Sequence, residues 1–190
     1  HFKSESSDCD NKVNIRVAKV ELWRYLFLYK YEGIYLDIDS SIEKPLSQLI
    51  KDEDQAIITL ENHPEKKYYV QWGLIFSKNH PILKKLIELV CDNIKNNNYP
   101  NDIHKMTGPT VYSKAINAIH MELYNNKINS KEVNENKDIT FTSNETSYRF
   151  YDIDYRSYFC YLHKDKIHKL LHNHNKHSTN EQKVKPLLII

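Results

Sequence analysis

The first part of the chain has a helical pattern of apolar residues, followed at once by a short apolar run. Residues 11–32 carry one apolar face with steps of three and four, formed by Ile15, Ala18, Leu22, Leu26 and Tyr29. Gly33 suits the end of that helix. Residues 34–38 then predict a short buried strand, with Asp37 and Asp39 at its C-terminal end.

The rest of the pattern alternates strands with helices. Residues 56–60, 69–76 and 139–142 predict further strands, and Gly73 interrupts the second of these. Two helices are predicted to begin at Pro81 and Pro109, since proline is favourable at the first helical position. Their apolar steps are Leu83, Leu86, Val90 and Ile94 in one and Tyr112, Ala115, Ile119 and Leu123 in the other. This order predicts an α/β fold with a mixed or parallel sheet flanked by helices.

Composition narrows the class of protein. With 190 residues, 40% of them hydrophobic and 27% charged, the chain is expected to fold as a single domain over residues 1–190. The net charge of +2 gives no basis for nucleic-acid binding. No apolar run reaches the roughly 18 residues of a membrane span. We therefore expect neither a nucleic-acid partner nor a membrane span in this chain.

The number and spacing of the cysteines indicate the kind of cellular compartment in which the protein is expected. Three cysteines far apart in the sequence predict neither a disulfide framework nor a zinc site. They favour a reducing compartment such as the cytoplasm. The Golgi lumen is the alternative if an upstream anchor has been removed.

Glycine is scarce, and this excludes two kinds of nucleotide site. The chain has only Gly33, Gly73 and Gly108, whereas phosphate-binding loops need several glycines close together. A Walker loop and a dinucleotide fingerprint are therefore both excluded. Any bound nucleotide would have to be held through charge, with a metal ion as the expected intermediary.

Asp37 and Asp39 are the candidate metal ligands. In an extended segment, residues i and i+2 project to the same side, so their carboxylates could face one cation. Two buried like charges are costly without a cation between them. Oxygen ligands favour Mg²⁺ or Mn²⁺, and an added histidine favours Mn²⁺. The alternative for an isolated Asp-x-Asp is that one Asp caps a turn and the other is solvated.

The residues around this pair resemble a known family. Arg24-Tyr25 and the run from Gly33 to Asp39 are similar to the signature of the glycosyltransferases with a sugar-binding region containing a DXD motif. Weaker similarity continues at Trp72-Gly73, His80-Pro81 and Thr107-Gly108-Pro109. Two positions depart from the family pattern: Val20-Glu21 stands for Ser-Asp, and Glu32 stands for Gly.

The resemblance implies a GT-A-type fold and an activity. A hexose-type sugar would pass from a UDP- or GDP-sugar to a glycan, protein or lipid acceptor, with retention of anomeric configuration and with help from Mn²⁺ or Mg²⁺. The family also has a nucleotide-binding strand upstream of this region. No counterpart precedes residue 11, so the chain is expected to lack that strand and to be truncated at its N-terminus.

The resemblance also implies roles for particular residues. Asp37, Asp39 and Arg24 would be catalytic, and Asp37, Asp39 and a C-terminal histidine, of which His172 is the best candidate, would bind the metal. The residues expected at the donor are Glu21, Tyr25, Tyr35, Asp37, Trp72, Gly73 and Gly108. Structural alternatives stay open at this point for Arg24 as a surface ion pair, Trp72 as a core aromatic, Gly108 as a helix start and His172 in a solvated segment.

Two other functions are compatible with parts of the pattern. A phosphatase of the haloacid dehalogenase type also has Asp-x-Asp after an apolar strand, but it needs a later Gly-Asp motif, and the chain contains no Gly-Asp pair. A non-catalytic sugar- or partner-binding module derived from the glycosyltransferase fold is the second alternative. It is motivated by Glu21, by Glu32 and by the expected absence of the upstream strand.

Overall fold

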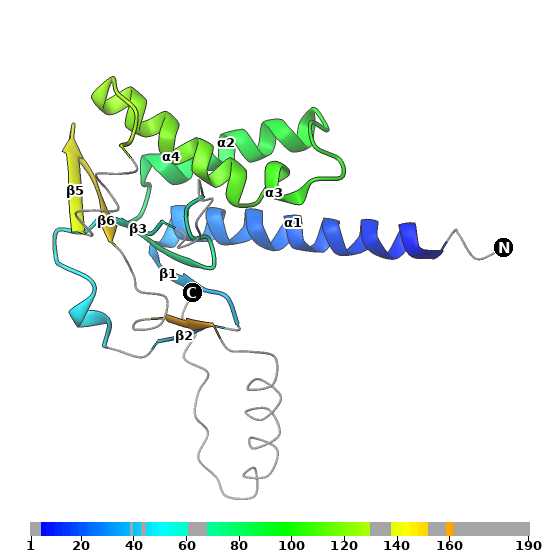
Figure 1. The fold of residues 1–190 in the computed structure, drawn as a ribbon, viewed down its shortest axis with the longest axis horizontal. Coiled ribbons are helices and arrows are strands. Elements are labelled where there is room, and N and C mark those ends of the chain that lie inside the picture. Colours follow the sequence, from blue (N-terminus) through cyan, green and yellow to red (C-terminus); the bar gives the residue numbers. More distant parts are fainter. Residues whose placement is uncertain are drawn as a thin grey trace, which may run out of the picture.

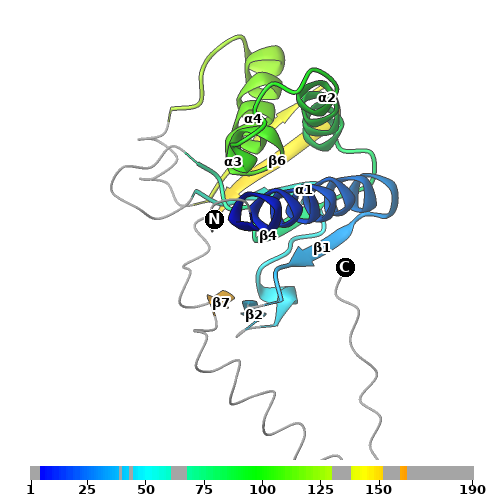
Figure 2. The same cartoon turned by 90° about the vertical axis from the view of Figure 1, so that its right-hand side faces the viewer.

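The computed structural model describes residues 5–38, 40–42, 45–60, 68–129, 138–151 and 159–161. Figures 1 and 2 show the arrangement of its elements from two sides. The helices are α1 (Glu5–Tyr31), the 3-10 helix η1 (Leu46–Gln48), α2 (Pro81–Lys95), α3 (Ile103–Met106) and α4 (Pro109–Tyr124). The strands are β1 (Gly33–Leu36), β2 (Ser40–Ile42), β3 (Ala56–Ile58), β4 (Gly73–Phe76), β5 (Asp138–Ser143), β6 (Thr146–Tyr151) and β7 (Phe159–Tyr161).

The described strands form a mixed sheet, which confirms the predicted α/β class. Its order is β1-β4-β3-β6-β5, and β2 pairs separately with β7. β3 and β6 run parallel, whereas β1–β4, β3–β4 and β5–β6 are antiparallel. The helices α1, α2 and α4 pack over one face of the sheet, and their buried side chains join those of β3, β4 and β6 in one cluster.

Both faces of the central strands are buried, and successive side chains of each strand point to opposite faces. Ala56 and Ile58 of β3 point into the cluster under the helices, while Ile57 belongs to a smaller cluster with Leu49 and Ile75 on the other face. The segment after η1 covers this second face through Leu49, which is 2% exposed. Of the helices in the part of the chain described, none is long and apolar enough to cross a membrane.

The face of α1 that packs on the sheet agrees only in part with the predicted one, since Leu22 and Tyr29 do pack against the main cluster. Ile15 and Leu26 are 57% and 46% exposed, whereas Tyr25 and Leu28 are fully buried. The apolar pattern was misleading because α1 buries two charged residues, Glu21 and Arg24, on its inner side.

The outer side of α1 carries aromatic residues instead. The ring of Phe27 lies between those of Trp23 and Tyr31, with centroid distances of 5.2 and 4.8 Å. These aromatic residues made the helix apolar on more than one side, so the spacing of apolar positions did not single out the buried face.

The end of α1 also differs in detail from the prediction. The helix stops at Tyr31, and Glu32 adopts the left-handed conformation with φ 57° while its N–H donates to the carbonyl of Leu28. Gly33 follows with φ 122° and begins β1. Glu32 therefore occupies the C-terminal capping position at which glycine has no steric cost.

Two substitutions on α1 test which of its faces is buried against the sheet. Leu28→Ala should lower the free energy of unfolding by about 2–5 kcal/mol, because Leu28 is fully buried in the main cluster. Leu26→Ala should cost much less, about 1 kcal/mol or below, because Leu26 is 46% exposed. Urea denaturation of both variants measures the difference, and equal losses would contradict this assignment of the buried face.

His80 caps α2 from a buried position. It is 2% exposed, its Nδ1 accepts the N–H of Ile82 at 3.2 Å, and its Nε2 lies 3.1 Å from the carbonyl of Ser147 in β6. Both contacts are satisfied when the ring is neutral with its proton on Nε2. Burial lowers the pKa of His80 to about 4, and only the hydrogen bond to Ser147 opposes this shift.

This cap predicts a loss of stability in acid. The unfolded chain binds a proton on His80 below a pH of about 6.5, whereas the folded chain does so only near pH 4. The free energy of unfolding should therefore fall with pH across this window, by about 3 kcal/mol from His80. Urea denaturation at pH 7 and pH 4.5 measures the fall. The His80→Asn variant should be less stable at pH 7 and lose less on acidification, and an unchanged pH dependence would contradict the prediction.

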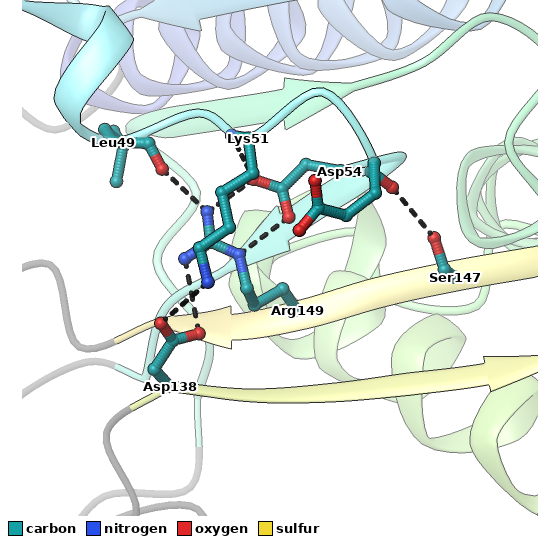
Figure 3. A network of polar contacts seen from close by, with 7 residues as sticks. Leu49, Lys51, Asp54, Asp138, Ser147 and Arg149 are labelled. Atoms are coloured by element: carbon teal, nitrogen blue, oxygen red, sulfur yellow. Dashed lines mark hydrogen bonds and ion pairs between the residues drawn. The ribbon is translucent and has the colours of Figure 1, made fainter.

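A buried arginine on β6 forms hydrogen bonds and an ion pair with the segment before β3 (Figure 3). Arg149 is 1% exposed, its Nε donates to Asp54 Oδ1 at 2.6 Å, and its guanidinium also pairs with Asp54 Oδ2 and with the carbonyl of Leu49. Asp138 of β5 lies on the outer side of the same guanidinium, 3.3 Å from NH1, and also pairs with the exposed Lys51. β6 thus carries a charged residue in its middle, which is why the sequence pattern left this strand unassigned.

Candidate functional site

Five of the predicted site residues line one cleft on the helical side of the fold. The cleft has a volume of 530 Å³ and lies between α1, the end of β1, the segment before β4 and the corner between α3 and α4. Its walls include Glu21, Arg24, Tyr35, Asp37 and Trp72. These residues are up to 51 positions apart in the sequence (72 − 21), so the fold brings them together.

Arg24 is buried in the floor of this cleft between two carboxylates. It is 5% exposed, with NH1 at 3.2 Å from Asp37 Oδ1 and NH2 at 3.1 Å from Glu21 Oε1. Its guanidinium lies 5.1 Å from the centroid of the Tyr35 ring, and its Nε has no hydrogen-bond partner among the described residues. Arg24 is therefore not a surface ion pair, and it provides a fixed positive charge beside Asp37.

Glu21 is held by contacts within the protein. It is 8% exposed, its Oε1 accepts from Arg24, and its Oε2 accepts from the hydroxyl of Thr107 at 2.5 Å. Burial raises the pKa of Glu21, although Thr107 and Arg24 oppose this shift. Each carboxylate oxygen already has a partner, so the contacts of Glu21 position Arg24 against the α3–α4 corner.

Asp37 lies at the mouth of the cleft, immediately after β1. Its N–H donates to the carbonyl of Trp72 at 2.8 Å, which extends the pairing of β1 with β4 by one residue. The hydroxyl of Tyr35 donates to Asp37 Oδ1 at 2.8 Å, and Arg24 contacts the same oxygen. The side chain is 37% exposed, so it is oriented by two partners and still accessible from the cleft.

The backbone changes direction just after Asp37. The carbonyl of Asp37 accepts the N–H of Ser40 at 2.8 Å, which closes a turn over residues 37–40. The strand ends at Leu36, whereas the predicted strand ran to residue 38, so Asp37 and Ile38 lie beyond the end of β1. Asp39 itself lies outside the described residues, and so does His172.

The remaining predicted donor residues take other places. Tyr25 is fully buried, and its hydroxyl donates to the carbonyl of Thr107 at 2.8 Å, so it supports the cleft from below and exposes no surface to a donor. Gly73 begins β4 opposite Leu36. Gly108 precedes α4, and a Cβ at this position would lie 2.8 Å from the Cα of His104. Gly108 therefore allows a close contact between α3 and α4.

Sequence reasoning missed three residues of the cleft region. Thr107 is fully buried and joins α1 to the α3–α4 corner through Glu21 and Tyr25. Its only sequence signal was its place before Gly108-Pro109. Arg16 and His104 also line the cleft, and neither had a signal, because Arg16 belongs to no recognised motif and α3 was not predicted.

The carboxylate chemistry at the cleft fits one part of a divalent-metal site. Asp37 offers oxygen ligands of the kind that Mg²⁺ and Mn²⁺ prefer. Within the described residues no group of three His, Cys, Asp or Glu side chains is placed to hold a metal ion. The two other predicted ligands, Asp39 and His172, are outside that part of the chain. Asp37 is therefore the one predicted metal ligand whose position is known.

Sequence comparison finds one family that matches the first part of the chain. Residues 1–56 match the family described as "Glycosyltransferase sugar-binding region containing DXD motif". This matched range includes Glu21, Arg24, Asp37 and Asp39. The predicted resemblance to this family is thereby confirmed for the first 56 residues of the chain, and two named relatives extend the similarity beyond them.

Two of the relatives that match the chain are mannosyltransferases by name. The chain is 25% identical to the initiation-specific alpha-1,6-mannosyltransferase of Candida albicans, over 64% of this chain and 38% of that protein. It is 28% identical to the protein of the same name from Schizosaccharomyces pombe, over 53% of this chain and 31% of that protein. The matches thus span less than two fifths of either relative. Among solved structures, the PaToxG glycosyltransferase matches with a TM-score of 0.48 and 23% identity, over 71% of this chain and 47% of that one.

Proposed function

We propose that this protein is a glycosyltransferase that takes a hexose-type sugar from a UDP- or GDP-sugar and passes it to a glycan, protein or lipid acceptor. The observation that carries the proposal is the contact of Arg24 with Asp37 in the wall of the cleft, in a chain whose first 56 residues match the DXD family. A buried cation next to an accessible carboxylate can bind a diphosphate and a metal ion side by side.

We further propose that Asp37 and Asp39 hold Mn²⁺ or Mg²⁺, with His172 as a third ligand. Such an ion would act as a Lewis acid and stabilise the negative charge on the departing nucleoside diphosphate. Retention of anomeric configuration belongs to the same proposal and follows from the family resemblance.

The residues of the chain then have distinct tasks. Tyr35 donates its hydroxyl hydrogen bond to Asp37 and, together with Arg24, fixes the orientation of that carboxylate. Arg24 supplies a permanent positive charge, and Glu21 and Thr107 keep its guanidinium in place. Trp72 lines the same cleft and offers an aromatic surface to a sugar ring.

The test is a binding and turnover screen on the intact chain. UDP- and GDP-hexoses are titrated calorimetrically with and without MnCl₂, and release of nucleoside diphosphate is then followed for any donor that binds. We expect at least one donor to bind only in the presence of the metal and to be slowly hydrolysed. A folded chain that binds no nucleotide sugar would favour a non-catalytic binding module. Phosphate release from a generic phosphoester without donor binding would favour a phosphatase.

A further inference from the structure

A second cavity lies beside the cleft and is apolar. Its volume is 410 Å³, and it lies between the N-terminal half of α1, the end of α2 and α3. The side chains that matter for its chemistry are Ile15, Ile94, Asn97, Tyr99, Ile103 and Met106. In Figure 1, α3 lies between α1 and the ends of α2 and α4, so this cavity is on the same side of the sheet as the cleft.

The two cavities share a wall. Ile103 of α3 lines both of them. On α1, Arg16 and Val17 line the cleft, while their neighbours Ile15 and Ala18 line the second cavity. A single turn of α1 and a single residue of α3 therefore separate the two spaces. A ligand seated in the cleft could extend past Ile103 into the second cavity.

The lining excludes some occupants and favours one. The side chains around this cavity carry no formal charge, and Ile15 and Ile94 are 57% and 45% exposed there, which leaves large apolar surfaces in water. A peptide would bring backbone N–H and C=O groups that need partners, and the polar lining side chains are only those of Asn97 and Tyr99. An alkyl chain has no such groups, and its burial is favourable in proportion to its area.

We propose that this second cavity binds the alkyl chain of a lipid-linked acceptor, whose polar head group lies in the part of the cleft next to Ile103. The assignment of the bound molecule as an acceptor rests on the proposed function of the cleft. Binding of an alkyl chain does not depend on sugar transfer. The two claims can therefore fail separately.

The experiment compares two probes on the intact chain by calorimetry. Octyl β-D-glucopyranoside, kept below its micelle concentration, is titrated against methyl β-D-glucopyranoside. The octyl compound is expected to bind at least tenfold more tightly than the methyl compound. Ile94→Asn should remove most of that advantage without unfolding the chain, since Ile94 is 45% exposed. Met121→Asn is the matched control, because Met121 is 41% exposed on α4 and does not line this cavity.

Each outcome decides the proposal. Equal affinity for the two probes would overturn it, and so would equal loss in the Ile94 and Met121 variants, which would indicate general adsorption of detergent. If Ile94→Asn instead converted a dimer to a monomer by light scattering and left octyl glucoside binding unchanged, the cavity would be an interface between two copies. Octyl glucoside binding that depends on Ile94, in a chain that binds no nucleotide sugar, would support the cavity and reject the transferase.

Discussion

Asp37→Asn is expected to abolish metal-dependent binding of the nucleotide sugar while leaving the fold intact. The amide keeps an oxygen for Arg24 and Tyr35 but removes the negative charge that a divalent ion requires. The loss of a charged contact of this kind costs on the order of 3 kcal/mol, which corresponds to about a 100-fold loss of affinity. Calorimetry with the donor and MnCl₂ measures the change, and a thermal melt reports on the fold.

Two further variants make this result specific. Asp39→Ala should cause a similar loss, because we assign Asp39 to the same ion. Asp52→Asn serves as the control, since Asp52 is an exposed aspartate that does not line the cleft. If donor affinity in the Asp37 or Asp39 variant equalled that of the wild type, the metal assignment would be wrong.

Asp54→Ala is expected to be strongly destabilising. It would leave the fully buried Arg149 without its closest carboxylate, and removing one partner of a buried ion pair costs about 3–5 kcal/mol. The pairing lowers the pKa of Asp54, although burial opposes this shift. Stability from Asp54 should thus be present above the ordinary pKa of an aspartate and be lost as the pH falls through its lowered value.

The same network supplies a matched control (Figure 3). Lys51 pairs with Asp138 at 3.1 Å, but these side chains are 49% and 39% exposed. Lys51→Ala should therefore cost less than about 1 kcal/mol. Urea denaturation of both variants gives the comparison. If Asp54→Ala lowered the free energy of unfolding no more than Lys51→Ala does, the buried ion pair would not stabilise the packing of β6.

Local signals explain which elements the sequence predicted well. Proline at the first position and regular apolar steps identified α2 and α4, whose structures begin at Pro81 and Pro109 as expected. The predicted strands of residues 56–60 and 139–142 also correspond to β3 and β5. In each case the information lies within a few neighbouring residues and does not depend on the rest of the chain.

Other features depend on residues far apart and had no local signal. β6 contains Arg149, which is tolerated in a buried strand because Asp54, 95 positions earlier, neutralises it. Glu21 is buried on α1 because Thr107, 86 positions later, donates to it. The family resemblance named five of the residues that line the cleft, including Arg24, Asp37 and Trp72. It did not predict that Tyr25 would be buried beneath them or that the backbone would turn after Asp37.

The central claim is that Asp37 and Asp39 share a divalent ion with a nucleoside diphosphate in the cleft. A crystal structure of the intact chain with Mn²⁺ and the nucleoside diphosphate of a bound donor tests it most directly, since the anomalous signal locates the ion. We expect one Mn²⁺ within about 2.0–2.5 Å of carboxylate oxygens of both aspartates, with the diphosphate near Arg24. A nucleotide bound elsewhere, or an ion that contacts neither aspartate, would contradict the account.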